Sequence, residues 1–277
     1  MGTALVTGAT SGIGEEFCWQ LAAAGHDLVL VARREDALRA LADSLANVAG
    51  VRAEVIAADL STNEGCARVA ARLDVGGPAD RDKPDLAPVD LLVNNAGFGT
   101  GKDVADDAPE RLEQEVRLNC LAVVGLTARY LPAMRERGSG TIINISSTAA
   151  FQPLPHMAVY GATKAFVLSF TEALWRENRR NGIRVLAVCP GSTDTPFFEV
   201  SDEATVVGKL RSTRQVVNAA MRALKVGKPS VVDGLMNAVA ARFVTRVFPK
   251  RPMLAVVDGI FGRGQAKRGR QAANRRR

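Results

Sequence analysis

Short runs of apolar and β-branched residues recur along the chain, and longer stretches with apolar positions three and four residues apart follow them. The short runs fit buried strands and the longer stretches fit amphipathic helices. Strands that alternate with helices are typical of βαβ units, so the pattern predicts an α/β protein with a parallel sheet. The expected strands are 3–7, 27–32, 51–58, 89–93, 141–145, 185–188 and 230–233, and the expected helices are 15–24, 35–46, 109–137, 159–181 and 215–224.

A glycine-rich turn lies between the first expected strand and the first expected helix. Its glycines, Gly8, Gly12 and Gly14, let the backbone turn sharply and approach a pyrophosphate. The following helix N-terminus offers free N–H groups and the positive end of its dipole. Such a turn is weak evidence alone, but with a strand before it, a helix after it and a second strand at 27–32 it predicts nucleotide binding.

The end of the second expected strand indicates which nicotinamide cofactor is bound. NAD-binding folds carry an acidic residue there, about 20 residues after the glycines, which binds the ribose 2′-hydroxyl. Here Ala32 takes that place, and Arg33 and Arg34 follow it. Guanidinium groups pair with a 2′-phosphate, so the sequence favours NADP(H) over NAD(H). The alternative is that both arginines only begin the solvated helix 35–46.

Tyr160 and Lys164 stand four residues apart at the start of an expected helix, and Ser147 ends the strand before it. Residues i and i+4 share a helix face, and ligands bind at the carboxyl ends of strands in open α/β sheets. A ketone that receives hydride needs a proton, and a neighbouring ammonium lowers the pKa of a phenol toward the working pH. Ser147 would stabilise the same oxygen. Tyr and Lys also occur at this spacing by chance, so the pair gains weight only beside the glycine turn.

Together with Asn94-Asn95-Ala96-Gly97, Asn119 and Pro190-Gly191, these features resemble the motifs of the short-chain dehydrogenase/reductase family from about Thr3 to Thr195. The resemblance implies a single-domain Rossmann fold, a doubly wound parallel sheet of about seven strands with helices on both faces, which binds NAD(P)(H). It implies that Tyr160 is the general acid/base and that Lys164 binds the nicotinamide ribose and lowers the Tyr160 pKa. It implies further that Ser147 positions the carbonyl and that Asn119 holds a water of the proton relay.

The resemblance also implies the cofactor contacts. Asp59 is expected near the adenine ring, and a turn or N-cap role is equally open from the sequence. Thr195 resembles the residue that touches the carboxamide, with a helix cap before Pro196 as the alternative. The expected cofactor-binding residues are Gly8, Thr10, Ser11, Gly12, Ile13, Gly14, Arg33, Arg34, Asp59, Leu60, Asn95, Ala96, Gly97, Tyr160, Lys164, Pro190, Gly191, Thr193 and Thr195.

One domain with a C-terminal extension accounts for the whole chain, because no internal repeat and no linker interrupts the alternation. The stretch 76–88, rich in Gly, Pro and charge, is expected to be an exposed loop because a strand follows it directly. The expected units are a catalytic domain 1–234 with a substrate lid at about 196–225, an amphipathic extension 235–262, and a basic disordered tail 263–277.

The extension has apolar positions at helical spacing through 235–248, with Arg242 and Arg246 between them, and 253–261 is apolar again. The first interpretation is a lid over the substrate pocket or an oligomer contact. The second is a basic amphipathic helix on an anionic membrane surface. A spanning helix is not expected, since no run of about 20 apolar residues exists.

The net charge of +7 would indicate a nucleic-acid partner, but its location argues otherwise. Seven of the 36 Lys and Arg residues lie in 263–277, which has no Asp or Glu, so the rest of the chain balances at 29 charges of each sign. No nucleic acid is therefore expected for the body, and solvation, RNA, anionic lipid or an acidic partner stays open for the tail.

Cys18, Cys66, Cys120 and Cys189 are scattered without metal-ligand spacing, so we expect free thiols, no metal site and a reducing cytoplasm. No secretory signal is recognisable at the N-terminus. His156 precedes Tyr160 in a loop and is a candidate for the substrate pocket. By analogy with the resembled family, the long helices 109–137 and 159–181 are expected to form a homodimer or homotetramer.

The expected function is an NADP(H)-dependent oxidoreductase that transfers hydride between NADPH and the carbonyl of a small-molecule ketone or alcohol. Phe197, Phe198 and the apolar extension favour an apolar substrate. One alternative is an NADP-binding sensor or scaffold with little turnover, and another is an RNA- or membrane-associated protein that acts through its tail. The complete set of Ser147, Tyr160, Lys164 and Asn119 argues against a pure sensor.

Overall fold

The computed structural model of the chain describes residues 2–74, 86–197, 210–244 and 249–275. Seven parallel strands form one sheet in the order β3-β2-β1-β4-β5-β6-β7. The order reverses between β1 and β4, and ligands bind outside the carboxyl ends of the strands at such a switch point. The strands are β1 (Thr3–Thr7), β2 (Asp27–Ala32), β3 (Ala53–Ala57), β4 (Val89–Asn94), β5 (Gly140–Ile145), β6 (Ile183–Cys189) and β7 (Ser230–Val232).

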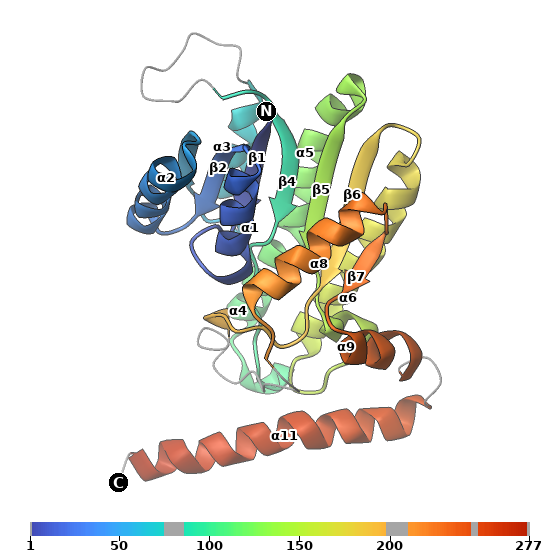
Figure 1. The fold of residues 1–277 in the computed structure, drawn as a ribbon. Coiled ribbons are helices and arrows are strands. Elements are labelled where there is room, and N and C mark those ends of the chain that lie inside the picture. The colour runs from blue at the N-terminus through green and yellow to red at the C-terminus, as the bar shows by residue number, and fades with distance from the viewer. Residues whose placement is uncertain (1, 75–85, 198–209, 245–248, 276–277) are drawn as a thin grey trace.

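Helices cover both faces of the sheet, as the predicted Rossmann fold requires (Figure 1). Successive strand residues point to opposite faces, so Val6 packs in one core with Phe17 of α1, while Leu5 packs in the other core with Leu126 of α5. Helices α1, α2 and α8 enclose the first core, and α3, α5 and α6 enclose the second. Their bounds are α1 (Gly12–Ala23), α2 (Glu35–Ala49), α3 (Asn63–Ala70), α5 (Ala122–Arg137), α6 (Ala158–Asn178) and α8 (Thr213–Lys225).

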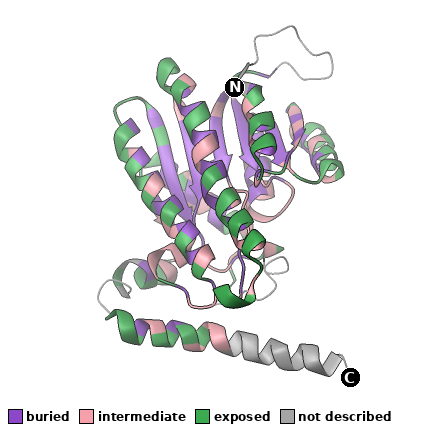
Figure 2. Ribbon diagram, turned by 180° about the vertical axis from the view of Figure 1, so that it is seen from behind, coloured by how far each residue is buried: buried purple, intermediate pink, exposed green. Residues whose placement is uncertain are grey.

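The strands are almost continuously buried, which is what a parallel sheet covered on both faces demands (Figure 2). One polar chain nevertheless crosses the second core. Asn94 and Asn144 face each other in register on β4 and β5, and Nδ2 of Asn94 donates to Oδ1 of Asn144 at 2.8 Å. Nδ2 of Asn144 then donates to the hydroxyl of Thr171 on α6 at 2.9 Å. These buried amides tie two strands and a helix together, a contact that the sequence did not reveal.

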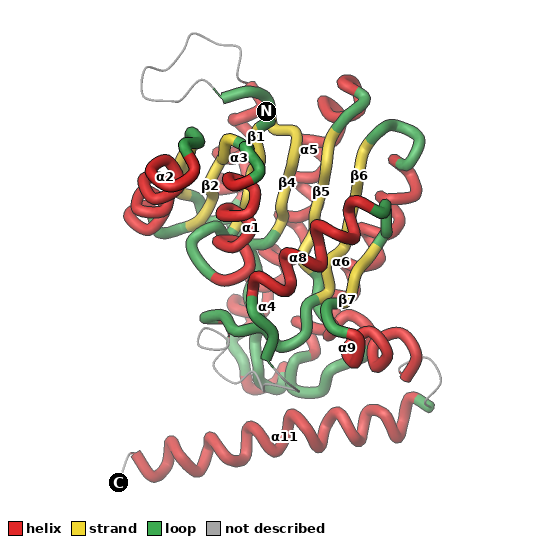
Figure 3. Tube along the Cα trace, viewed as in Figure 1, coloured by secondary structure: helices red, strands yellow, loops and turns green. Residues whose placement is uncertain are grey.

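The expected helix 109–137 is present but is not regular throughout. It consists of α4 (Pro109–Val116), a π-helical turn η3 (Arg117–Leu121) and α5. Figure 3 shows α4 and α5 among the helices, which are coloured red. Asn119 lies in the π-helical turn and is buried. Such turns often mark functional positions, because one extra residue re-aims the side chains around it. Helix α3 was not predicted, and the expected loop 76–88 lies largely outside the described residues.

The C-terminal region adds three helical segments at the carboxyl ends of the strands: α9 (Leu235–Val239), a π-helical turn η5 (Ala240–Val244), and α11 (Lys250–Arg275). Helix α11 crosses this end of the molecule (Figure 1). Its helical bounds extend through Arg275, and the basic disordered tail expected at 263–277 stays a prediction. Ala, Gln, Lys and Arg all have high helix propensity, so composition alone does not separate a charged helix from a disordered tail.

The apolar positions of the extension divide into two groups. Met253 and Val257 of α11 are buried, whereas Leu235 and Met236 of α9 are each 80% exposed and Phe243 of η5 is 66% exposed. The apolar residues of α11 therefore pack against the body, whereas the large apolar residues of α9 do not. Over the described ranges, no helix combines the length and the apolar character that a membrane crossing needs.

Candidate active site

The glycine turn sits at the carboxyl end of β1, where the predicted nucleotide site requires it. Gly8 and Gly12 have φ values of 65° and 59°, which side chains of L-residues rarely adopt. At Gly14 a Cβ would overlap the carbonyl oxygen of Gly8, so only glycine lets α1 begin this close to the turn. The turn is thus a cradle of bare backbone at a helix N-terminus, a suitable surface for a pyrophosphate.

Asn95 braces this turn from the end of β4. Its Nδ2 donates to the carbonyl oxygens of Thr7 and Gly8 at 3.0 and 3.2 Å. The hydroxyl of Thr7 in turn accepts hydrogen bonds from the backbone N–H groups of Asn95 and Ala96 at 2.9 and 3.0 Å. The two polar side chains lock β1 to β4 at the switch point, so the segment 94–97 holds the turn in place as well as lining the site.

A pair of arginines, Arg33 and Arg34, follows the end of β2. Nη2 of Arg34 donates to the carbonyl oxygen and to the hydroxyl of Thr10, at 3.4 and 3.3 Å. Arg33 and Arg34 are exposed and line the same cavity as the glycine turn. Asp59 lines it too, and its Oδ1 also accepts hydrogen bonds from the N–H and hydroxyl of Ser61. The turn role that was left open for Asp59 is therefore present, while Thr62 caps α3.

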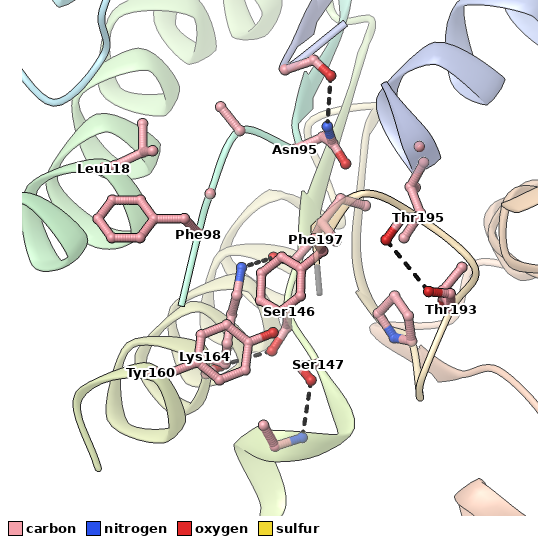
Figure 4. Close-up of a pocket in the computed structure, with 18 of the residues that line it drawn as sticks. Asn95, Phe98, Leu118, Ser146, Ser147, Tyr160, Lys164, Thr193, Thr195 and Phe197 are labelled. Carbon is pink, nitrogen blue, oxygen red and sulfur yellow. Dashed lines mark hydrogen bonds between the residues drawn. The ribbon is translucent and has the colours of Figure 1, made fainter. Parts of the chain in front are cut away.

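Tyr160 and Lys164 lie one turn apart at the start of α6 and line this cavity together with Ser147 (Figure 4). Nζ of Lys164 lies 5.8 Å from the centroid of the Tyr160 ring and donates to the carbonyl oxygen of Ile145 at 3.0 Å. The hydroxyl of Ser147 accepts from the N–H of Ala149 at 3.1 Å, and that of Ser146 donates to the carbonyl oxygen of Lys164 at 2.7 Å. Three of the four predicted catalytic residues thus meet at the end of β5.

The pKa of Tyr160 differs from the prediction. Burial raises the pKa of Tyr160 to about 12; a hydrogen bond with Ser147 opposes this shift and the charge of Glu115 adds to it. Burial lowers the pKa of Lys164 to about 8. The expectation that Lys164 lowers the pKa of Tyr160 is wrong for this structure. The ammonium is directed to the Ile145 carbonyl rather than to the phenol, so desolvation of the phenol dominates.

Asn119 lies behind the cavity wall and does not line it. Its Nδ2 donates to the carbonyl oxygen of Phe98 and to the hydroxyl of Thr163, and its Oδ1 accepts from the N–H of Phe98. A Cβ on Gly97 would lie 2.8 Å from Oδ1 of Asn119 and 3.4 Å from Nζ of Lys164, so both groups reach the same glycine. The position is next to Lys164, as expected, but both atoms of the amide already have protein partners.

One cavity of about 1250 Å³ collects nearly all of the predicted site residues. Asn119 and Gly14 are the exceptions, and both lie directly behind its lining. Thr195 packs against Gly12, with its methyl group 2.9 Å from the place of a glycine Cβ. The predicted residues that line the cavity are Gly8, Thr10, Ser11, Gly12, Ile13, Arg33, Arg34, Asp59, Leu60, Asn95, Ala96, Gly97, Ser147, Tyr160, Lys164, Pro190, Gly191, Thr193 and Thr195.

Several lining residues were not singled out by the sequence. Phe197 was expected, and its ring centroid lies 5.5 Å from that of Tyr160, while Phe198 lies outside the described residues. The apolar repeat at 253–261 signalled the contribution of α11, although not which of its residues would face the cavity. The lining residues near Tyr160 that were missed are Gln152, Leu154, Met157, Val257, Ile260 and Phe261.

Comparison with known proteins agrees with this geometry. The family described as short chain dehydrogenase matches residues 2–206. A putative ketoacyl reductase of Streptomyces coelicolor is 43% identical over 197 residues, which cover 70% of this chain and 71% of that protein. A short-chain dehydrogenase of Sphingobium yanoikuyae, solved in complex with NADPH, has a TM-score of 0.78 and 32% identity and covers 91% of this chain and 98% of its own.

A second solved structure, the bulky-bulky ketone specific alcohol dehydrogenase from Comamonas testosteroni, has a TM-score of 0.73 at 29% identity, over 91% of this chain and 96% of its own. Fold and site define an oxidoreductase that acts on carbonyl or alcohol groups with a nicotinamide cofactor. The chain belongs to the short-chain dehydrogenase/reductase family.

Proposed function

We propose that this protein is an NADP(H)-dependent carbonyl reductase that transfers hydride between NADPH and a bulky, apolar ketone. The observation that carries the proposal is that Ser147, Tyr160 and Lys164 line the same cavity as the glycine turn and the arginines after β2. A proton donor, a cation and a dinucleotide cradle within one cavity are the parts that ketone reduction needs.

The residues present fit NADP(H). Gly8, Gly12 and Gly14 leave backbone where side chains would block a pyrophosphate. Arg34, held beside Thr10, offers a guanidinium for a 2′-phosphate. Ala32 stands at the end of β2, where NAD-binding folds have an acidic residue. When bound, the nicotinamide supplies the hydride. The NADPH found in the Sphingobium relative supports the same preference.

The chain's own residues handle the proton. A phenol with its pKa raised to about 12 is protonated at neutral pH, so Tyr160 is ready to donate to the oxygen of a ketone. Ser147, which hydrogen-bonds to Tyr160, would donate to the same oxygen as negative charge develops there. Lys164, whose ammonium lies 5.8 Å from the centroid of the phenol ring, would hold the nicotinamide ribose beside Tyr160, the role that the family resemblance implies.

Apolar side chains near Tyr160 indicate the substrate class. Leu154 and Met157 from the loop before α6, Val257 and Phe261 from α11, and Phe197 from the segment after β6 surround this end of the cavity. Burial of apolar surface against them favours a large hydrocarbon group beside the carbonyl. The name of the Comamonas relative, which is specific for bulky-bulky ketones, agrees with this inference.

The test is NADPH consumption by the purified protein with a panel of aliphatic, steroidal and acyl ketones. Tyr160→Phe should reduce turnover by about 10²- to 10⁴-fold while NADPH still binds, because the ring remains and the proton is lost. The matched control is Tyr130→Phe, which removes the other tyrosine hydroxyl, bound to the Val69 carbonyl at 2.9 Å in the core. Binding of NADPH without turnover of any ketone would favour the sensor.

We also propose a peripheral contact with anionic membranes. Leu235, Met236, Val239 and Phe243 expose apolar surface on α9 and η5, and the exposed Lys250 and Arg251 begin the next helix. Apolar side chains beside cations suit the boundary between headgroups and acyl chains. A cytoplasmic homodimer or homotetramer stays a prediction from the family resemblance.

A further inference from the structure

His156 lies where three separate segments of the substrate end meet. Its Nδ1 is 2.6 Å from Oδ1 of Asp103, in the connection between β4 and α4. Its Nε2 is 2.9 Å from Oδ1 of Asp258 on α11. His156 itself belongs to the loop between β5 and α6, four residues before Tyr160. One imidazole therefore joins three elements that are far apart in the sequence.

Both ring nitrogens face carboxylate oxygens, so the protonated imidazole suits this arrangement. An imidazolium donates from both nitrogens, whereas the neutral ring has one acceptor nitrogen that would face an acidic oxygen. Burial lowers the pKa of His156, but the hydrogen bonds and charges of Asp103 and Asp258 outweigh it and raise that pKa above its usual value. Among the described residues, these two carboxylates are the charged groups that act on the ring.

The backbone at His156 is held in an unusual conformation. Its φ of 66° makes it the single described residue other than glycine with a positive φ. Non-glycine residues enter this region at a cost, and they persist there where the surroundings hold them. Helix α11 passes close to the ring, because a Cβ on Gly262 would lie 3.3 Å from Nε2. The conformation of the loop and the close approach of α11 are thus linked at one side chain.

The part of α11 that His156 holds is the part that lines the cavity. Met253 and Val257 are buried against Leu154 and Met157. Val257, Ile260 and Phe261, the residues around Asp258, line the cavity near Tyr160. The apolar contacts of α11 with the body form a small cluster. The two charge-assisted hydrogen bonds of His156 therefore contribute a large part of the free energy that holds α11 in place.

We propose that His156, held between Asp103 and Asp258, is a positioning residue that fixes α11 as the apolar wall of the substrate end and so sets the preference for bulky ketones. The inference rests on the proposed reductase function. Asp103, His156 and Asp258 together form the His156 clamp. Because the clamp needs the imidazolium, it is complete at low pH and is lost as the pH rises through the pKa of His156.

The experiment compares kcat and KM for a bulky diaryl ketone and a small cyclic ketone between about pH 6 and about pH 9. In the native protein, KM for the bulky ketone should rise about tenfold over this range beyond any change in KM for the small ketone. Asp258→Asn and Asp103→Asn should show the raised KM already at about pH 6, with kcat for the small ketone unchanged. His156→Asn, which tolerates a positive φ, should behave likewise.

The matched control is Asp106→Asn, which removes an exposed carboxylate from the same connection as Asp103 and should leave both KM values as in the native protein. Hydrogen–deuterium exchange gives a readout without turnover. At one fixed pH of about 6, amides of 253–262 should exchange about tenfold faster in Asp258→Asn than in the native protein. Native KM values for the bulky ketone in both clamp variants, or unchanged exchange in α11, would overturn the proposal. If α11 exchanges faster in Asp258→Asn but neither the native protein nor any variant consumes NADPH, the role of the His156 clamp in holding α11 stands and the proposed reductase function is refuted.

Discussion

Asn119 exchanges two hydrogen bonds with the backbone of Phe98: the N–H of Phe98 donates to Oδ1 at 3.2 Å, and Nδ2 donates to the Phe98 carbonyl oxygen at 2.8 Å. The π-helical turn aims this amide at the segment after β4, which carries Gly97 and Phe98 past Lys164. Asn119 therefore holds the cavity wall in place, in addition to any role in proton transfer.

Asn119→Ala should lower the free energy of unfolding by about 2–3 kcal/mol, because the partly buried N–H and carbonyl of Phe98 lose their partner. Asn119→Asp should not restore the lost stability, because the carboxylate can accept from the Phe98 N–H but has no N–H for the Phe98 carbonyl and buries a charge. Urea denaturation followed by circular dichroism measures both values. A loss below about 0.5 kcal/mol for the alanine variant would mean that the segment with Gly97 and Phe98 keeps its conformation without Asn119.

Replacing Arg33 and Arg34 together with alanine should weaken NADPH binding by about 10- to 100-fold and leave NADH binding nearly unchanged. Charge-assisted hydrogen bonds to a phosphate are of this strength, and NADH has no 2′-phosphate. Fluorescence titration with each cofactor gives the two dissociation constants. Arg39→Ala, which removes an exposed arginine paired with Glu35 on α2, is the control. Equal losses for both cofactors would assign the arginines to the solvated surface.

Glu115 should make stability fall with rising pH. Its side chain is fully buried, and burial raises its pKa from 4.5 to about 7, against the hydrogen bonds from Thr100 and the charge of Lys164. The folded state therefore keeps the proton that the unfolded state releases. The contribution is fully present below about pH 4.5 and is lost as the pH rises through about 7, by roughly 3 kcal/mol in total.

The measurement is the difference in unfolding free energy between the native protein and Glu115→Gln across this pH range. The native protein should lose stability relative to the variant as the pH increases, and Glu113→Gln, an exposed neighbour on α4, should follow the native profile. Parallel profiles for all three proteins would show that Glu115 titrates as it does in the unfolded chain.

Phe243→Glu combined with Leu235→Glu should reduce retention on anionic vesicles at low salt by about tenfold or more, because two apolar contacts become charges of the same sign as the lipid. Sedimentation with phosphatidylserine-containing vesicles measures the bound fraction. Val226→Glu is the matched control, since Val226 is 68% exposed and precedes the amino end of β7, whereas α9 and η5 follow its carboxyl end. If neither form binds, the surface has another occupant.

The alternation of strands and helices was sufficient to predict all seven strands, because a run such as Leu28–Val31 is buried on both faces and has no other stable place. Motif spacing also brought Tyr160, Lys164 and the glycine turn together correctly. The sequence could not supply contacts between distant segments. His156 and Asp258 are 102 residues apart, and nothing in either local pattern marks them as partners.

The pKa of Tyr160 is a second property that the sequence could not predict. Helical spacing correctly placed a cation on the face of the phenol, but the direction of a pKa shift depends on where the ammonium is aimed and on how much water reaches the ring. Likewise, the helical pattern of 109–137 did not reveal the π-helical turn, because one extra residue per turn changes few apolar positions. Such features depend on tertiary packing.

The paired amides of Asn94 and Asn144 have a consequence for assembly of the sheet. Most of the surrounding residues of β4 and β5 are aliphatic side chains of similar size, which would tolerate several alignments of the two strands. A slip by one residue would point one amide to the other face, break the hydrogen bond between the two amides and separate the displaced amide from its threonine partner. Shifted alignments of β4 and β5 therefore cost free energy at this one polar pair. The register of the two strands is selected by a specific hydrogen bond and not by the shapes of their aliphatic side chains.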